Sequence, residues 1–197
     1  MQLKSETKLD IEPWNLLNHP FYKAWNAGTL PLKALKTYAE EYGVFIDLMP
    51  IGWQTLDDEE TATEEREHIE LWAEFADGLN TAVSVVTIDE VMSLRDVTER
   101  LFASSATAVG AMYAFEMQQP ETARTKLSGL QEFYELPSSC EVYFETHSHN
   151  EHEAEKLLAY YNRLSFDEQS IADLACSEMS KAMWDALTGI HDWDCDN

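Results

Sequence analysis

A nearly uncharged stretch in the middle of the chain places the strongest constraint on its fold. The segment LFASSATAVGAMYAFEM, residues 101–117, carries one charged side chain, Glu116. A helix of this composition has no polar face for solvent, so it is buried on most of its sides. Such a helix must be covered by other elements, and the sequence therefore favours a compact bundle.

Helical periodicity dominates the remaining sequence. Apolar side chains recur at spacings of three and four, and glycine, asparagine and proline mark the ends. The expected helices, about seven, cover residues 11–25, 30–56, 59–79, 87–117, 120–134, 141–164 and 166–190. Pro20 interrupts the first helix, and Pro50 and Gly52 should kink or break the second. We predict one all-α domain over residues 1–197, without a sheet.

The charge of the chain limits its partners. There are 37 acidic and 13 basic residues, a formal net charge of −24. Such a surface repels phosphate backbones and anionic lipids, so neither nucleic-acid nor membrane binding is expected. The N-terminus has no apolar signal segment, and no run approaches the ~20 apolar residues that span a bilayer. We expect a cytoplasmic protein.

Glu116 is the first candidate for chemistry. It follows GAMYAF in the most apolar helix of the chain. Burying a carboxylate is costly unless it is paired, hydrogen-bonded or bound to a metal. We therefore favour a functional carboxylate over a helix-end residue that faces solvent.

A second candidate group lies on helix 59–79. His68 follows Glu60 by eight residues, about two turns, so both can share one face. Glu64 and Glu65 are also within reach of this histidine. The spacing Glu65-x-x-His68 occurs in carboxylate-bridged di-iron bundles. Either Glu60 or Glu65 could be a ligand, and a solvated glutamate-rich face is the alternative.

A third group gathers histidines on helix 141–164. His147, His149 and His152 are three of the six histidines in the chain. His147 and Glu151 can share one face, and His149 and His152 another, so one helix cannot point all of them inward. Carboxylates and imidazoles are ligands suited to iron or manganese.

Several motifs resemble a known family. HPFYKAWNAGTLPLKALKTYAEEY resembles the heme-oxygenase-like superfamily, and YAFEMQQPETARTKLSGLQEFY resembles the CADD family specifically. HIELWAEFADGL, YFETH and MWDALTGI agree with it, so the resemblance covers nearly the whole chain. It implies a seven-helix, heme-oxygenase-like bundle around two metal ions, iron or manganese, that uses molecular oxygen and a reductant.

The resemblance also implies metal ligands. Glu60 and His68 take the two places on the third helix, with one extra residue between them compared with the family. Glu116 takes the place before Gln-x-Pro, and His147 and Glu151 begin the last motif.

The final ligand of that motif departs from the family. The family's last histidine falls on Ala154, and His152 is two residues short of it, about 200° around an ideal helix. His152 is therefore a doubtful sixth ligand. Glu145, His149 and His152, at i, i+4 and i+7, form an alternative set.

The resemblance implies a reaction. CADD-like proteins are implicated in making para-aminobenzoate for folate synthesis from their own tyrosine, with a lysine supplying nitrogen. Tyr22 matches the sacrificed tyrosine, and Tyr38 and Tyr143 match tyrosines near the metals. Lys126 matches the amine donor, whereas Phe115 replaces a family tyrosine. From the residues alone, such tyrosines are usually core and such a lysine usually lies on the surface.

Other functions stay open. An oxygenase of this fold could act on an external small molecule, and a TenA-like or PqqC-like enzyme is a further alternative. TenA-type enzymes need a nucleophilic cysteine, which the positions after Glu116 lack, and the retained carboxylates argue against a metal-free PqqC-type oxidase. A non-catalytic interaction protein that has lost metal is the last alternative. We expect a homodimer whose substrate is a small molecule or one of its own side chains.

Overall fold

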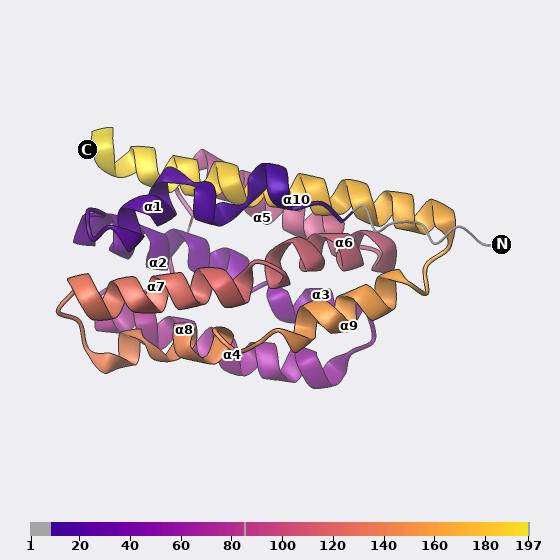
Figure 1. Ribbon diagram of the computed structural model, residues 1–197, viewed down its shortest axis with the longest axis horizontal. Coiled ribbons are helices and arrows are strands. Elements are labelled where there is room, and N and C mark those ends of the chain that lie inside the picture. Colours follow the sequence, from indigo (N-terminus) through magenta and orange to yellow (C-terminus); the bar gives the residue numbers. More distant parts are fainter. Residues whose placement is uncertain (1–8, 85, 197) are drawn as a thin grey trace.

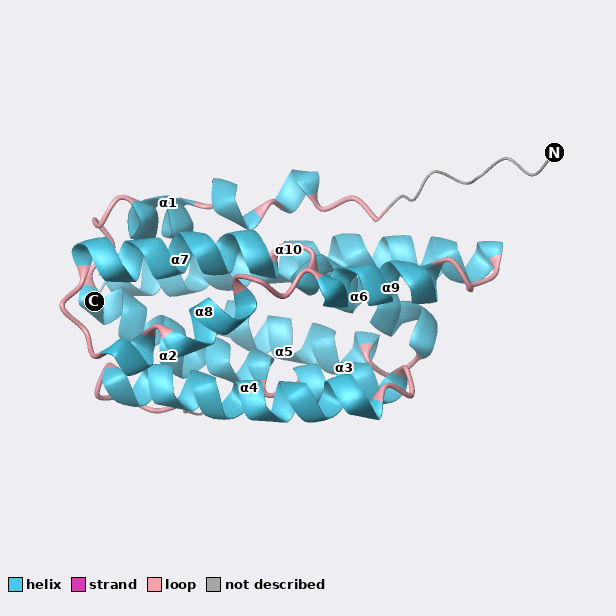
Figure 2. Cartoon of the chain, turned by 60° about the horizontal axis from the view of Figure 1, so that its bottom comes forward, coloured by secondary structure: helices cyan, strands magenta, loops and turns pink. Residues whose placement is uncertain are grey.

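The computed structural model describes residues 9–84 and 86–196, with side chains to residue 193. Helices joined by short loops make up this part of the chain (Figure 2). No β-strand occurs among these residues, which confirms the predicted all-α fold class. Residues 1–8, on which the expectation of a missing signal segment depends, lie outside the described residues.

The helices follow the predicted segments. The described residues form α1 (Pro20–Asn26), α2 (Leu32–Ile46), α3 (Met49–Thr55), α4 (Glu59–Gly78), α5 (Asp89–Leu101), α6 (Ser105–Glu116), α7 (Gln119–Phe133), α8 (Val142–His147), α9 (His152–Tyr161) and α10 (Phe166–Asp196). Short 3-10 helices cover Glu12–Trp14, Leu16–Asn18 and Ser138–Cys140. Each of the seven expected segments is helical. The first is interrupted before Pro20, as predicted, so that two 3-10 helices precede α1, and three others are divided in two.

Local sequence explains these divisions. Pro50 lies in the first turn of α3, where its missing N–H is not needed, so the expected break falls just before it. Ser104 caps α6 by accepting a hydrogen bond from the backbone N–H of Thr107, which divides the segment predicted as one helix over 87–117. The third break separates α8 from α9 at residues 148–151, so the rotation of an ideal helix cannot be extrapolated across it.

Helix α6 occupies the interior, as its composition predicts. Every residue from Ala108 to Glu116 is buried. Its closest partner is the long α10: a Cβ atom at Gly110 would lie 1.9 Å from the carbonyl oxygen of Ala172. The missing side chain therefore lets the two backbones meet.

Figure 1 shows α10 along one side of the bundle and α4 along the other, beside α8 and α9. The buried Trp72 of α4 donates a hydrogen bond of 3.0 Å to the carbonyl oxygen of Ala39 in α2. Its ring also lies edge-on against Tyr143 of α8, with centroids 4.9 Å apart. These contacts fix α4 between α2 and α8. In the part of the chain that the structure describes, no helix has the length and apolar character needed to cross a membrane.

Candidate metal centre

Five ionisable side chains from four helices meet in the interior. They are Glu65 and His68 of α4, Glu116 of α6, His147 of α8 and Glu153 of α9, and we call them the inner cluster. Ligand atoms of Glu65, His68 and His147 lie within 4.8 Å of one another, and so do those of Glu65, Glu116 and Glu153. Glu65 belongs to both trios and lies between them. All five are buried except His68, which is partly buried.

The buried face of α4 selects Glu65 over Glu60. Glu65, His68 and Trp72 follow one another at spacings of three and four residues and therefore share a face. Trp72 is fully buried, so this face turns inward. Glu60 lies five residues before Glu65, about 140° around the helix, and is exposed.

Most carboxylate oxygens of the inner cluster lack a hydrogen-bond donor. Both side-chain oxygens of Glu116, both of Glu153, and Oε1 of Glu65 are buried with no partner among the described residues. Burial, together with the charges of Glu153 and Glu65, raises the pKa of Glu116 well above its usual value. Burial and the charge of Glu65 likewise raise the pKa of Glu153. Three such carboxylates can all be ionised only beside a cation, so this donor set fits a metal.

The histidines present free ring nitrogens to the same site. The Nδ1 of His147 donates a hydrogen bond of 2.7 Å to the carbonyl oxygen of Tyr143, which leaves Nε2 as an unprotonated ligand atom. Burial and the neighbouring His68 lower the pKa of His147 to about 3, so its ring is neutral. Burial lowers the pKa of His68, but the hydrogen bond to Glu65 and the charges of the neighbouring glutamates together outweigh it and raise that pKa overall. The two imidazole rings lie 4.4 Å apart.

Two of the ligands implied by the family resemblance lie elsewhere. The structure brings His68, Glu116 and His147 together but leaves Glu60 and Glu151 exposed, outside the inner cluster. Because α8 ends at His147, Glu151 does not share a helix face with it as expected. The Oε1 atom of Glu151 instead lies 3.5 Å from Nη1 of Arg124. The expected convergence of Glu60 and Glu151 on the site is thus corrected. Metal ligation by the other three stays a prediction.

The histidines after the helix break also differ from expectation. His152 is exposed, and its ligand atom lies within 4.8 Å of those of Glu64 and Glu153. Glu145 and His149 are exposed and belong to none of these groups, so the alternative set is not assembled. Glu153 was missed by sequence reasoning. The periodicity of the preceding helix could not have predicted its inward position, because the chain breaks between α8 and α9 and the direction in which side chains point is reset there.

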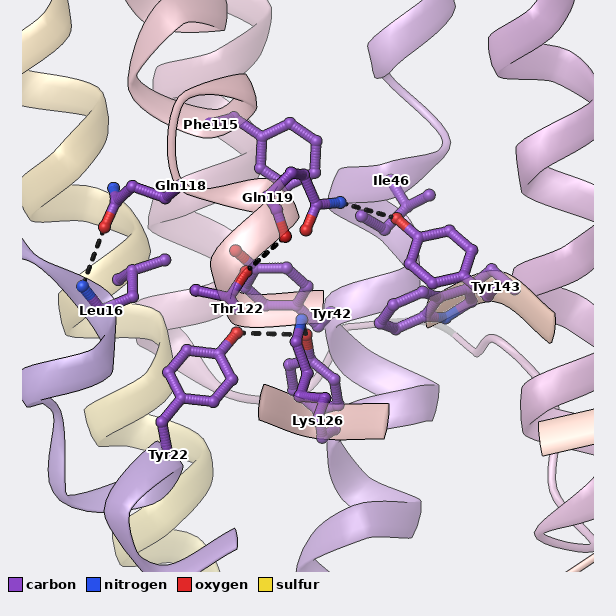
Figure 3. A pocket seen from close by; sticks show the side chains of 12 residues that line it. Leu16, Tyr22, Tyr42, Ile46, Phe115, Gln118, Gln119, Thr122, Lys126 and Tyr143 are labelled. Carbon is purple, nitrogen blue, oxygen red and sulfur yellow. Dashed lines mark hydrogen bonds between the residues drawn. The ribbon is translucent and has the colours of Figure 1, made fainter. Parts of the chain in front are cut away.

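Buried side chains enclose a small cavity in the interior (Figure 3). Its volume is about 10 Å³, room for roughly one water molecule, and Tyr22, Tyr38, Lys126 and Tyr143 all line it. The hydroxyls of Tyr22 and Tyr38 are 3.4 Å apart, and Lys126 Nζ donates a hydrogen bond of 3.2 Å to Tyr38. Figure 3 shows Tyr22 and Lys126 pointing toward one another. The four residues that the resemblance assigns to the reaction thus share one enclosure.

Lys126 is buried rather than on the surface. Its Nζ lies 5.1 Å from the ring centroid of Tyr22 and 5.2 Å from that of Phe144. No ion pair in the described part of the chain involves this amine. Burial lowers its pKa to about 7, so much of the amine is neutral at neutral pH. A neutral amine is a nucleophile, whereas an ammonium ion is not.

Tyr143 connects the cavity with the inner cluster. Its ring lies 4.1 Å from the ring of His147, and its hydroxyl accepts a hydrogen bond of 3.1 Å from Gln119 Nε2. Burial and the charges of Glu65 and Glu116 raise the pKa of Tyr143 well above its usual value. Its phenol therefore stays protonated between the two sites.

A helical bundle with buried carboxylates and histidines at its centre defines a class of metal-dependent redox proteins. Residues 49–184 match the family model described as iron-containing redox enzyme. The chain belongs to this family, and it is a metal-using oxidoreductase with the heme-oxygenase-like fold.

The comparisons with individual proteins agree. A 4-aminobenzoate synthase of Chlamydia pneumoniae is 29% identical over an alignment of 162 positions, which covers 70% of this chain and 70% of that protein. A second 4-aminobenzoate synthase, from Nitrosomonas europaea, is 27% identical, with 98% of this chain and 93% of that protein covered. These matches confirm the predicted resemblance to the CADD family.

Two solved structures share the fold. A TenA homologue from Pseudomonas syringae superposes with a TM-score of 0.76 at 14% identity, covering 91% of this chain and 88% of the other. A CADD-like protein of unknown function from Nostoc punctiforme gives a TM-score of 0.65 at 15% identity, with 92% of each chain covered.

Proposed function

We propose that this protein activates oxygen at a two-metal centre and forms 4-aminobenzoate from its own tyrosine. The relatives named 4-aminobenzoate synthase support the product. The observation that carries the self-derived route is the size of the cavity, about 10 Å³. A cavity of ~150 Å³ is known to hold benzene. An external aromatic substrate does not fit here, whereas the rings of Tyr22 and Tyr38 are already in place.

The inner cluster would hold the two ions. Glu65, His68 and His147 suit one ion, and Glu65, Glu116 and Glu153 suit the other, with Glu65 placed to contact both. Iron is the proposed metal and manganese the alternative, because both accept mixed imidazole and carboxylate ligands. Bound metal would supply oxygen activation and the oxidation of an aromatic ring with the help of a reductant, chemistry that side chains lack.

The residues of the cavity would prepare the substrate. Burial raises the pKa of the Tyr22 phenol, which therefore keeps its proton until it reacts. The closed wall excludes bulk water from that ring. Lys126 holds its amine beside Tyr22 and Tyr38 and is partly neutral at neutral pH, as a nitrogen donor must be.

The two cysteines whose side chains the structure describes disfavour a TenA-like hydrolytic route. Cys140 and Cys176 are both buried, and neither lines the cavity. Burial raises the pKa of Cys140, and it raises that of Cys176 to about 12. Neither thiol is activated as a nucleophile.

A complementation assay tests the proposal. Cells unable to make 4-aminobenzoate should grow when they express the native protein. Growth should be lost with Tyr22→Phe, which removes the reactive phenol, and with Lys126→Met, which is uncharged like the neutral lysine but has no amine. Tyr161→Phe is the matched control, because Tyr161 is a buried tyrosine whose hydroxyl bonds to Asp173 rather than to the cavity.

Mass spectrometry of the protein from the same cells completes the test. Mass changes are expected in the peptide that contains Tyr22, which gives up its ring, and in the peptide that contains Lys126, which gives up its nitrogen. Both changes should depend on iron and oxygen. Rescue by Tyr22→Phe at the native level would make Tyr22 a core residue only. Native protein that holds two metals and still fails to rescue would indicate oxygenation of an external substrate instead.

A further inference from the structure

A surface cleft of about 270 Å³ leads from solvent to the inner cluster. The acidic and imidazole side chains of its rim, among them Glu64, Glu67, His149 and His152, are exposed. His68 and Glu153, two members of the inner cluster, line the same cleft. The cleft therefore connects exposed ligand-type side chains with buried ones.

Three of these side chains form a group of their own. Ligand atoms of Glu64, His152 and Glu153 lie within 4.8 Å of one another. Glu64 and His152 are exposed, whereas Glu153 is fully buried and neither of its side-chain oxygens has a hydrogen-bond partner among the described residues. Such a buried, unpartnered carboxylate beside an imidazole and a second carboxylate is the donor set of a divalent transition metal.

Glu153 belongs to two groups at once. It shares the outer group with Glu64 and His152, and it shares an inner trio with Glu65 and Glu116. An ion that leaves the outer group can therefore keep one ligand while it gains the next two. The ion therefore always keeps a protein ligand during the transfer. Without one, it would be a bare charge in the protein interior, which is costly.

We propose that Glu64, His152 and Glu153 form an outer site for a divalent metal ion, through which the ion enters the inner cluster. This outer site is weaker than the inner one, because two of its three ligands are exposed and compete with water. The inference rests on the proposed function only in requiring that the inner cluster binds metal.

The test measures the filling of the full-length, metal-free protein with Fe²⁺ in the absence of oxygen. Stopped-flow mixing gives the rate at which metal becomes tightly bound, and equilibrium dialysis gives the number of tight and weak ions. His152→Ala and Glu64→Gln should slow filling by about tenfold or more and abolish a weak binding event seen with the native protein. The matched controls His149→Ala and Glu67→Gln alter the same rim outside the outer group, and they should fill at the native rate.

Two results would overturn the inference. One is filling of His152→Ala at the native rate with its weak ion retained. The other is an equal slowing in His149→Ala, since that would show a general attraction of cations to the rim.

A Glu116→Gln variant separates this inference from the proposed function. It should lose one tight ion but keep the weak ion, because Glu116 belongs to one inner trio and is no part of the outer group. Native protein without any tight metal would contradict the proposed function. A weak ion that disappears in His152→Ala would still establish the outer site in that case.

Discussion

The amine of Lys126 donates a hydrogen bond of 3.2 Å to the hydroxyl of Tyr38, and both side chains are buried. A phenol whose pKa is raised well above its usual value cannot serve as an anionic partner, so the amine has no counter-charge within the cavity. Burial without a counter-charge explains how this lysine can be neutral near physiological pH. The hydrogen bond places its amine beside two oxidisable rings.

Replacing Lys126 with methionine should change how stability depends on pH. The pKa of Lys126 is about 7 in the folded protein and near 10.5 when the chain is unfolded, so between these values the unfolded chain binds more protons. Native stability therefore gains from this residue as pH rises. Lys126→Met should be more stable than native protein at pH 7, and the difference should shrink by about 2–3 kcal/mol by pH 9.

Urea unfolding of both proteins at several pH values measures this difference, and the other titrating groups cancel in the comparison. Lys181→Met is the control, because it makes the same replacement at an exposed lysine. A pH-independent gap between Lys126→Met and native protein would show that the buried amine is not neutral.

Glu116→Gln should have opposite effects without and with metal. The variant has one fewer of three crowded carboxylates. With a chelator present, its free energy of unfolding should be about 1–3 kcal/mol higher than that of native protein, and it should unfold at a higher temperature. With Mn²⁺ at a hundred times its dissociation constant, each bound ion should add about 2.7 kcal/mol. Native protein should gain this from two ions, and the variant from the one ion that Glu65, His68 and His147 still hold. Thermal unfolding with chelator and with Mn²⁺ measures both. If native protein unfolds at the same temperature with chelator and with Mn²⁺, the inner cluster is not a metal site.

Two matched pairs test the ligand assignment. Glu65→Gln and Glu153→Gln should each lose at least one of two bound ions, because both side chains belong to the inner cluster. Glu60→Gln and Glu151→Gln alter exposed carboxylates and should keep both ions. Metal analysis after gel filtration gives the count. Loss of metal in Glu60→Gln but not in Glu65→Gln would restore the ligand set implied by the family spacing.

Gly110→Ala should destabilise the bundle. Its Cβ would lie 1.9 Å from the carbonyl oxygen of Ala172, so α6 and α10 must separate, at a cost of about 3 kcal/mol. Gly52→Ala is the control: its Cβ would meet the Sδ of Met112 at 2.3 Å, but that flexible side chain can move, and about 1 kcal/mol is expected. Chemical unfolding compares the two. If both variants lose the same free energy of unfolding, the contact between α6 and α10 adjusts at little cost.

The sequence alone determined the fold class and the centre of the bundle. A helix without charge must be buried, whatever surrounds it, and α6 is buried from Ala108 to Glu116. His68 and Glu116 were found for the same reason, since ionisable groups beside apolar residues are recognisable from spacing. The residue class of the inner cluster, carboxylate and imidazole, was thus predictable.

Only the tertiary structure decided which carboxylates complete the cluster. Periodicity shows which residues share a face within one helix, but the choice between Glu60 and Glu65 depended on which face Trp72 anchors in the core. The break at residues 148–151 resets the helical phase, so Glu153 turns inward while Glu151 turns to solvent. Lys126 likewise looks like a surface lysine in sequence. Its burial follows from the packing of the rings around it, which belong to segments far away along the chain.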